Sequence, residues 1–274
     1  MRKEYDTCAS EASKAIREKI LRMAFLGQSV HIPSAFSVVE ILDWVFESHI
    51  STATKPLMGG GEGDRLVLSK GHGVMALYAI LALNEIIAET HLENYFSDGS
   101  LLPGLCESRI PGCEVNSGSL GQGLSVAVGM ALGAKKLSQD NRFFVVVGDG
   151  ELNEGSIWEA FAFAVHNKLS NLTIIVDANG FQALGSTREV MNLTPLVQKC
   201  ASFGLKTVEA DGHSKESLRK AFAEVTSDSD DSPQLIVAHT VKGKGISFME
   251  SENSWHYRRL DEPTYKRALK ELCK

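Results

Sequence analysis

Hydrophobic positions along the chain fall into two kinds of pattern. In one set of segments apolar side chains recur at helical spacing, and in another they form short unbroken runs. Helical spacing is found at residues 11–26, 36–45, 74–87, 154–167, 194–202 and 214–226, in a segment ending near residue 137, and in a basic closing segment. The short apolar runs are residues 65–68, 143–147, 172–176, 205–209 and 235–240. Strand-length runs that alternate with helices predict an α/β fold built on parallel strands.

The clearest unit lies in the middle of the chain. A strand predicted at 143–147 stops at Gly148-Asp149-Gly150, and after a helix the strand predicted at 172–176 ends near Asn179. A crossover helix makes the two strands parallel neighbours, so Asp149 and Asn179 are expected at the carboxyl edge of one sheet. Open α/β sheets bind ligands at that edge.

The residue types at this edge suit a metal ion and a phosphate group. Asp149 offers an anionic oxygen and Asn179 a neutral amide oxygen, both suited to Mg²⁺ or Ca²⁺, which often share their coordination with phosphate. Gly148 and Gly150 carry no Cβ that would keep a diphosphate from the backbone. A lone G-D-G is weak, because it is also found in plain turns.

Three histidines lie in predicted loops and turns. His31 lies between two helices, where a surface position is the plainer interpretation. His72 lies in a strand-to-helix turn, where it could bind an anion or cap the helix. His256 lies before the closing helix, and Trp255 beside it either packs or forms a wall of a cofactor pocket. The residues alone leave these alternatives open.

The segment ahead of the central unit is irregular and then glycine-rich. Residues 96–115 show no clear periodicity, and such a stretch in a compact domain is more often an active-site segment than filler. N-S-G-S-L-G-Q-G at 116–123 opens an apolar helix, and its amides could cradle a phosphate or a cofactor ring. A dinucleotide site is disfavoured here, because no convincing strand precedes the glycines and their spacing is wrong.

Composition bounds these possibilities. The 274 residues, 43% of them hydrophobic, predict a single domain over residues 1–274, with a surface loop at 51–64. The net charge of −6 offers no basic surface for nucleic acid or anionic membrane. No apolar run is long enough to span a membrane, and no signal peptide is predicted. Five cysteines without a C-x-x-C pair are typical of free thiols in a cytoplasmic protein.

Several motifs together resemble the N-terminal half of transketolases. They are D-R-L-V-L-S-K-G-H at 64–72, V-N-S-G-S-L-G-Q-G-L at 115–124, G-D-G-E-L-N-E-G at 148–155, D-A-N at 177–179 and V-K-G-K-G at 241–245. G-D-G with an asparagine thirty positions after Asp149 also resembles the thiamine diphosphate fingerprint. The resemblance runs in order from about residue 12 to 270, nearly the whole chain.

The resemblance implies a thiamine diphosphate-binding fold, with a central parallel sheet flanked by helices on both faces. Asp149 and Asn179 would bind Mg²⁺ (or Ca²⁺) through their side chains, and Phe181 through its main-chain carbonyl. The residues implied in cofactor binding are His72, Gly118, Ser119, Leu120, Gly148, Asp149, Gly150, Glu154, Asn179 and Phe181.

The resemblance also implies the reaction and the residues near it. The expected chemistry is transfer of a two-carbon ketol unit from a ketose or ketose phosphate to an aldehyde. His31 and His256 match the family's histidines around the donor sugar, and His72 would reach the diphosphate. Glu154 matches a glutamate near the subunit interface that takes part in communication between sites.

Two features depart from the family's pattern. The chain ends at residue 274, where full-length transketolases continue into a pyrimidine-binding domain. The expectation is the N-terminal subunit of a split transketolase, working with a C-terminal subunit in an α2β2 assembly. Where the family usually reads P-G-H, this chain reads Pro103-Gly104-Leu105, which predicts a modified sugar donor or a non-standard acceptor.

Other interpretations belong to different classes. A 2-oxoacid dehydrogenase α subunit shares the G-D-G and asparagine pattern, but the motifs at 64–72 and 115–124 argue against it. A fragment of a deoxyxylulose-phosphate synthase is disfavoured on the same grounds. A half-protein that binds the cofactor without catalysis is the non-enzyme alternative.

Overall fold

The computed structural model describes residues 11–50, 63–227 and 231–273. Most of the surface loop predicted at 51–64 therefore lies outside the described residues. Within these ranges, no helix combines the length and the apolar character needed to cross a membrane.

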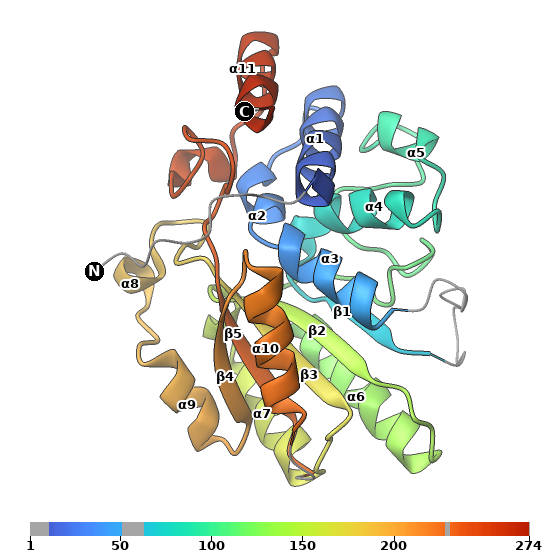
Figure 1. Cartoon of the computed structure of the whole chain (residues 1–274), viewed down its shortest axis with the longest axis vertical. Coiled ribbons are helices and arrows are strands. Elements are labelled where there is room, and N and C mark those ends of the chain that lie inside the picture. Colours follow the sequence, from blue (N-terminus) through green and yellow to red (C-terminus); the bar gives the residue numbers. More distant parts are fainter. Residues whose placement is uncertain (1–10, 51–62, 228–230, 274) are drawn as a thin grey trace.

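The centre of the molecule is a sheet of five parallel strands in the order β1-β2-β3-β5-β4 (Figure 1). Strands β1, β2 and β3 are buried along nearly their whole length, which explains their unbroken apolar runs. The edge strand β4 is mostly half-buried. The predicted strands are confirmed, and their bounds are β1 (Arg65–Leu68), β2 (Phe143–Gly148), β3 (Leu172–Ala178), β4 (Lys206–Asp211) and β5 (Gln234–His239).

Helices cover both faces of the sheet, as expected. Successive residues of a strand point to opposite faces: Phe144 and Val146 pack into one apolar cluster with α3, α4 and α10, while Val145 packs into a second with α6 and α7. The bounds are α1 (Glu11–Leu26), α2 (Ile32–Phe36), α3 (Val39–Ser48), α4 (Val74–Leu83), α5 (Thr90–Glu93), α6 (Gln122–Lys136), α7 (Gly155–His166), α8 (Thr187–Val190), α9 (Leu196–Ser202), α10 (Lys215–Val225) and α11 (Glu262–Leu272). Single 3₁₀ turns are η1 (Gly71–Gly73), η2 (Glu151–Asn153) and η3 (Asn253–His256).

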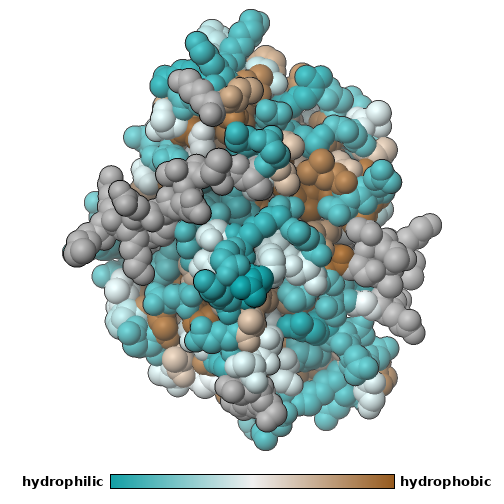
Figure 2. Space-filling view, in the orientation of Figure 1, coloured by the Kyte–Doolittle hydropathy of each residue, from teal (hydrophilic) through white to brown (hydrophobic). Residues whose placement is uncertain are grey.

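The surface agrees with this layering. The face turned to the viewer in Figure 1 is mainly hydrophilic, with hydrophobic residues in separate groups (Figure 2). Helix α10 lies on this face, and its apolar residues Leu218 and Phe222 are turned inward onto the sheet.

Two predicted helices are wrong in extent. The one at 36–45 is α3, which starts later because Val38 before it is not helical, and the short α2 ahead of it was not predicted. The one at 74–87 ends at Leu83, and Glu85 takes a left-handed φ of 57° that does not continue a helix. The four-residue helices α5 and α8 were not predicted, because so short a segment shows no periodicity.

Candidate active site

Polar residues follow the carboxyl ends of four strands and meet at one edge of the sheet. Lys70 comes after β1, Asp149 after β2, Asn179 after β3 and Thr240 after β5. In the register of the central pair, Gly148 lies opposite Asp177, and the Asp149 amide donates to the Asp177 carbonyl at 3.2 Å. The predicted meeting of the two strand ends is therefore present.

Asp149 is a buried carboxylate, only 8% exposed. Its Oδ1 accepts a hydrogen bond from the Gly150 amide at 2.8 Å, and its Oδ2 accepts one from Gly180 at 2.6 Å. Burial, together with the nearby charge of Asp177, raises the pKa of Asp149 to about 7. The carboxylate thus lies where additional positive charge would stabilise its ionised form.

Asn179 is held in one orientation. Its Nδ2 donates to Asp177 Oδ2 at 2.9 Å, and its Oδ1 accepts from the Phe181 amide at 3.0 Å. The Asp149 carboxylate, the Asn179 amide oxygen and the Phe181 carbonyl are hard oxygen donors, so this set fits Mg²⁺ or Ca²⁺. The described part of the chain has no group of three or more His, Cys, Asp or Glu side chains suited to a metal. The set described here contains only one such side chain, that of Asp149, and completes its ligands with an amide and a backbone oxygen.

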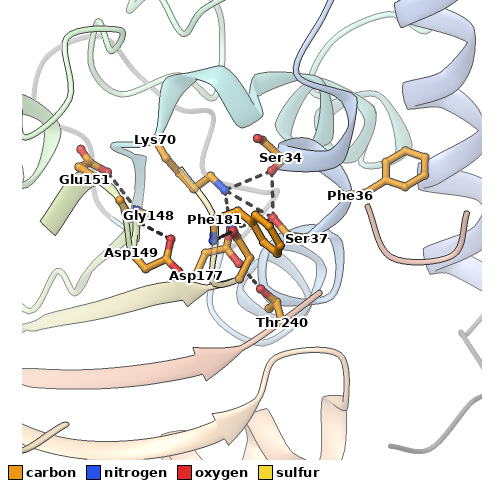
Figure 3. Close-up of polar contacts among 12 residues, drawn as sticks. Ser34, Phe36, Ser37, Lys70, Gly148, Asp149, Glu151, Asp177, Phe181 and Thr240 are labelled. Carbon is orange, nitrogen blue, oxygen red and sulfur yellow. Dashed lines mark hydrogen bonds and ion pairs between the residues drawn. The ribbon is translucent and has the colours of Figure 1, made fainter. Parts of the chain in front are cut away.

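A fully buried ion pair joins Lys70 to Asp177 at the same sheet edge (Figure 3). Burial alone would raise the pKa of Asp177, but Lys70 and hydrogen bonds from Ser37 and Thr240 lower it instead. Sequence reasoning missed this network. The signals for it were Lys70 in the S-K-G-H run and Asp177 in D-A-N, and neither motif pointed to the other.

A second buried lysine, Lys242, reaches the same edge from the V-K-G-K-G motif. Its Nζ donates to Asn253 Oδ1 at 3.0 Å and to the Gln182 carbonyl at 3.3 Å, and it lies 5.6 Å from the Phe181 ring. Burial and the charge of Lys70 lower its pKa to about 8. Lys242 thus brings a second cationic side chain to this edge, where Lys70 is already paired with Asp177.

The three predicted histidines come together from distant parts of the chain. Ring centroids are 5.5 Å apart for His31 and His72, 4.7 Å for His31 and His256, and 6.0 Å for His72 and His256. The His31 amide also donates to the His256 carbonyl at 3.1 Å. The surface-loop interpretation of His31 is therefore wrong.

All three imidazoles are neutral at neutral pH. Burial, reinforced by nearby cations, lowers the pKa of His31 to about 4 and that of His256 to about 3, and puts the pKa of His72 well below its usual value. His72 makes no cap, since the helix after it has no side-chain cap. Nδ1 of His31 and Nδ1 of His256 are buried without a hydrogen-bond partner among the described residues.

The glycine-rich turn opens α6 as predicted, and the element directly ahead of it is helix α5, not a strand. Residues 94–121 form turns with no helix or strand, which agrees with the irregular segment expected there. Leu105 lies over the start of the cradle, because a Cβ added at Gly118 would come within 2.7 Å of Leu105 Cδ1. The Leu105 carbonyl accepts a hydrogen bond from the Tyr78 hydroxyl at 3.1 Å.

Two further residues lie at the margins of the site. Glu154 is the exposed N-cap residue of α7, caps no amide, and lies beside Gly121 at the far end of the cradle. Trp255 is buried between Phe248, at 5.4 Å, and Arg258, at 4.6 Å. It is thus a packing residue.

Comparison with known proteins agrees with this geometry. The family described as "Transketolase, thiamine diphosphate binding domain" matches residues 10–272. An apulose-4-phosphate transketolase subunit of Phocaeicola vulgatus is 35% identical over 261 residues, covering 95% of this chain and 92% of that protein. A 6-deoxy-6-sulfo-D-fructose transketolase subunit of a Clostridium species is 38% identical over 245 residues, covering 89% and 88%.

Solved structures show the same fold. Transketolase from Leishmania mexicana superposes with a TM-score of 0.86 at 27% identity over 96% of this chain, which spans 41% of that longer protein. These matches favour transketolase over the 2-oxoacid dehydrogenase and deoxyxylulose-phosphate synthase alternatives. The strand-edge site, its cradle and the family match lead to one conclusion: the chain belongs to the transketolase family, as its thiamine diphosphate-binding domain.

Proposed function

We propose that this chain is the N-terminal subunit of a thiamine diphosphate- and magnesium-dependent transketolase. It transfers a two-carbon ketol unit from a ketose or ketose phosphate to an aldehyde, together with a C-terminal subunit that carries the pyrimidine-binding domain. The observation that carries this proposal is the convergence at one sheet edge of hard oxygen ligands, a glycine cradle and three neutral histidines. In this proposal residues 1–274 form one domain.

The metal is assigned to the oxygens of Asp149, Asn179 and Phe181. Support comes from the buried Asp149 carboxylate, which lacks a cation in contact with it among the described residues. A divalent cation held there would neutralise the carboxylate and would supply positive charge for a diphosphate. Removal of the metal with a chelator is therefore expected to release the cofactor.

The cofactor is assigned to the cradle and the strand ends around it. Thiamine diphosphate, when bound, supplies the carbon nucleophile and the electron sink for carbon–carbon bond cleavage. This chain holds and orients it through His72, Gly118, Ser119, Leu120, Gly148, Asp149, Gly150, Glu154, Asn179 and Phe181. Lys70 and Lys242 add positive charge at this buried edge.

The sugar substrate is assigned to the histidines. A neutral imidazole accepts a proton at one ring nitrogen and donates from the other, so His31 and His256 can bind sugar hydroxyls and transfer protons. The distance of 4.7 Å between their ring centroids supports a joint role in one sugar site. His72 is assigned to the diphosphate.

Leu105 is proposed to set the sugar specificity. Its side chain is 41% exposed and lies against Gly118 of the cradle, so it offers an apolar surface where a histidine would offer a hydrogen bond. A donor or acceptor with an apolar or deoxygenated group at that position is expected. The two relatives are named for two different sugars, so family membership leaves the substrate to such local differences.

The assembly is proposed to be a cytoplasmic α2β2 heterotetramer. Relatives that this chain covers over most of their length are named as subunits, which supports a separate partner chain. A second copy of this chain is placed against α6 and α7, where Val126 and Phe163 are exposed. Gly129 and Gly155 on the same helices have open space above them. The free thiols of the cysteines that the structure describes agree with a cytoplasmic location.

Reconstitution tests the proposed function. The purified chain is expected to show no ketol transfer alone and to gain it on mixing with a C-terminal subunit, to a maximum at equal amounts. The measurements are turnover with a ketose phosphate donor and an aldehyde acceptor, and complex mass by light scattering. Full turnover by the isolated chain would contradict the need for a partner.

A further inference from the structure

Glu151, the first residue of η2, joins three segments of the site through one carboxylate. Its Oε1 accepts hydrogen bonds from Ser69 Oγ at 2.5 Å and from the Gly121 amide at 2.8 Å, and its Oε2 accepts one from the Gly148 amide at 3.1 Å. These donors come from the end of β1, the cradle before α6 and the end of β2 (Figure 3 shows Glu151 beside Gly148). Among the side chains that the structure describes, no other bonds all three segments.

The electrostatic effect of Glu151 opposes binding of an anion. The side chain is 2% exposed, and none of the ion pairs among the described residues includes it. A buried carboxylate without a paired cation costs folding free energy and repels a diphosphate nearby. Any favourable contribution of Glu151 to the site must therefore come from the geometry that it imposes.

The cradle residue that Glu151 holds is fixed from both sides. The Gly121 amide donates to Glu151, and the Gly121 carbonyl accepts from Ser156 Oγ at 3.0 Å. Gly121 has a φ of +79°, and a Cβ there would lie 2.7 Å from Glu154 Cβ. A Cβ at Gly123 would lie 2.7 Å from Ser69 Cα. Gly121 thus has both of its backbone polar groups bonded, and there is little free space around it and Gly123.

We propose that Glu151 is a positioning residue that fixes the cradle of residues 118–121 against the ends of β1 and β2 and thereby sets the affinity for the diphosphate. This inference rests on the proposed function, which places the cofactor at that cradle. Glu151 acts through Gly121 and Gly148 and takes no part in the reaction itself.

The isosteric variant Glu151→Gln separates geometry from charge. An amide has one acceptor oxygen, so its NH₂ group must face the Gly148 or the Gly121 amide, donor against donor. Positioning predicts a rise in the Kd for thiamine diphosphate of about tenfold to a hundredfold. Loss of a buried negative charge predicts tighter binding, so the sign of the change decides between the two effects.

The measurement is calorimetry of thiamine diphosphate with excess Mg²⁺ on the chain with its partner subunit. Turnover at saturating cofactor is expected to fall by a smaller factor than the Kd rises, which a general loss of folding would not produce. The matched control is Glu189→Gln, an exposed glutamate that also accepts a bond from a serine hydroxyl, and its Kd should equal that of the wild type.

If Glu151→Gln does not fold, Ser69→Ala tests the same point by removing one of the three bonds, with an expected rise in Kd of about twofold to tenfold. Unchanged or tighter binding in the folded variants overturns the inference while leaving the proposed function intact. A wild-type complex that binds no thiamine diphosphate overturns the proposed function itself.

Discussion

Glu40→Gln is expected to destabilise the protein through a buried network that reaches the segment just after β5. Glu40 lies on α3 and is 4% exposed. Its carboxylate accepts hydrogen bonds from two Arg17 nitrogens at 2.6 and 2.9 Å, and it lies 2.8 Å from His213 Nδ1. His213 Nε2 accepts from the Val241 amide at 2.8 Å, so Nδ1 carries the proton and donates to Glu40. The network thus connects α1 and α3 to the segment that carries Lys242.

The magnitude follows from the pKa of Glu40. Burial opposes ionisation, but Arg17 and His213 outweigh it and lower the pKa from 4.5 to about 2. Each pKa unit corresponds to about 1.4 kcal/mol, so the ionised carboxylate contributes about 3 kcal/mol. Breaking a buried ion pair on one side costs about 3–5 kcal/mol, which agrees. At pH 7 the free energy of unfolding of Glu40→Gln is therefore expected to fall by about 3 kcal/mol.

The pH dependence has a definite sign. Because the folded-state pKa of Glu40 is lowered, its contribution is complete above about pH 4.5 and is lost as the pH falls towards 2. The difference between wild type and Glu40→Gln in urea unfolding should therefore narrow by roughly 1 kcal/mol between pH 7 and pH 3.5. Glu47→Gln, an exposed change on the same helix that breaks a surface ion pair with Lys215, should cost at most about 1 kcal/mol. A difference that is small at pH 7, or that widens in acid, would falsify this reasoning.

Three further predictions concern the site. Asp149→Ala should abolish thiamine diphosphate binding in calorimetry while circular dichroism shows the fold retained, because this residue lies beyond a strand end; unchanged affinity would contradict the metal assignment. In the reconstituted enzyme, Leu105→His should raise kcat/KM for xylulose 5-phosphate, and a wild type that already uses this donor efficiently and gains nothing would refute the specificity role. Tyr257 is 62% exposed and its ring lies 5.3 Å from His31 and 4.6 Å from His256, so Tyr257→Ala should raise the KM for sugar more than it lowers kcat. An unchanged KM would place this ring outside the sugar path.

The sequence predicted the parts of the site that follow from strand periodicity. Unbroken apolar runs predicted the strands, because strands buried on both faces carry apolar residues throughout. The polar residues that follow two of these strands, Asp149 and Asn179, were therefore expected at the carboxyl edge of the sheet. Motif resemblance added His31, His72 and His256, which local pattern had left open. Their approach to within 4.7–6.0 Å of one another needed the structure.

Contacts between distant polar residues could not be predicted in this way. Periodicity tells which face of an element is buried, but it does not tell which buried charge meets which. Lys70 and Asp177 are 107 positions apart, and Arg17 and Glu40 belong to different helices. Glu151 gave no signal either, because its partners are backbone amides, which every residue but proline carries, and a common serine hydroxyl.

The strand order has a consequence for how the protein forms during synthesis. Among the described strands, β4 pairs with β5 alone, and β5 lies between β3 and β4 although it is made after both. While the ribosome is still adding residue 230, β4 has no neighbour and one edge of β3 is open to solvent. The metal and cradle residues have all been added by then, whereas His256 and Lys242 have not. The pairing of β5 with β3 and β4 completes the sheet, and the histidine cluster forms in the same late step. Until then the nascent chain exposes an unpaired strand edge, a surface that chaperones protect.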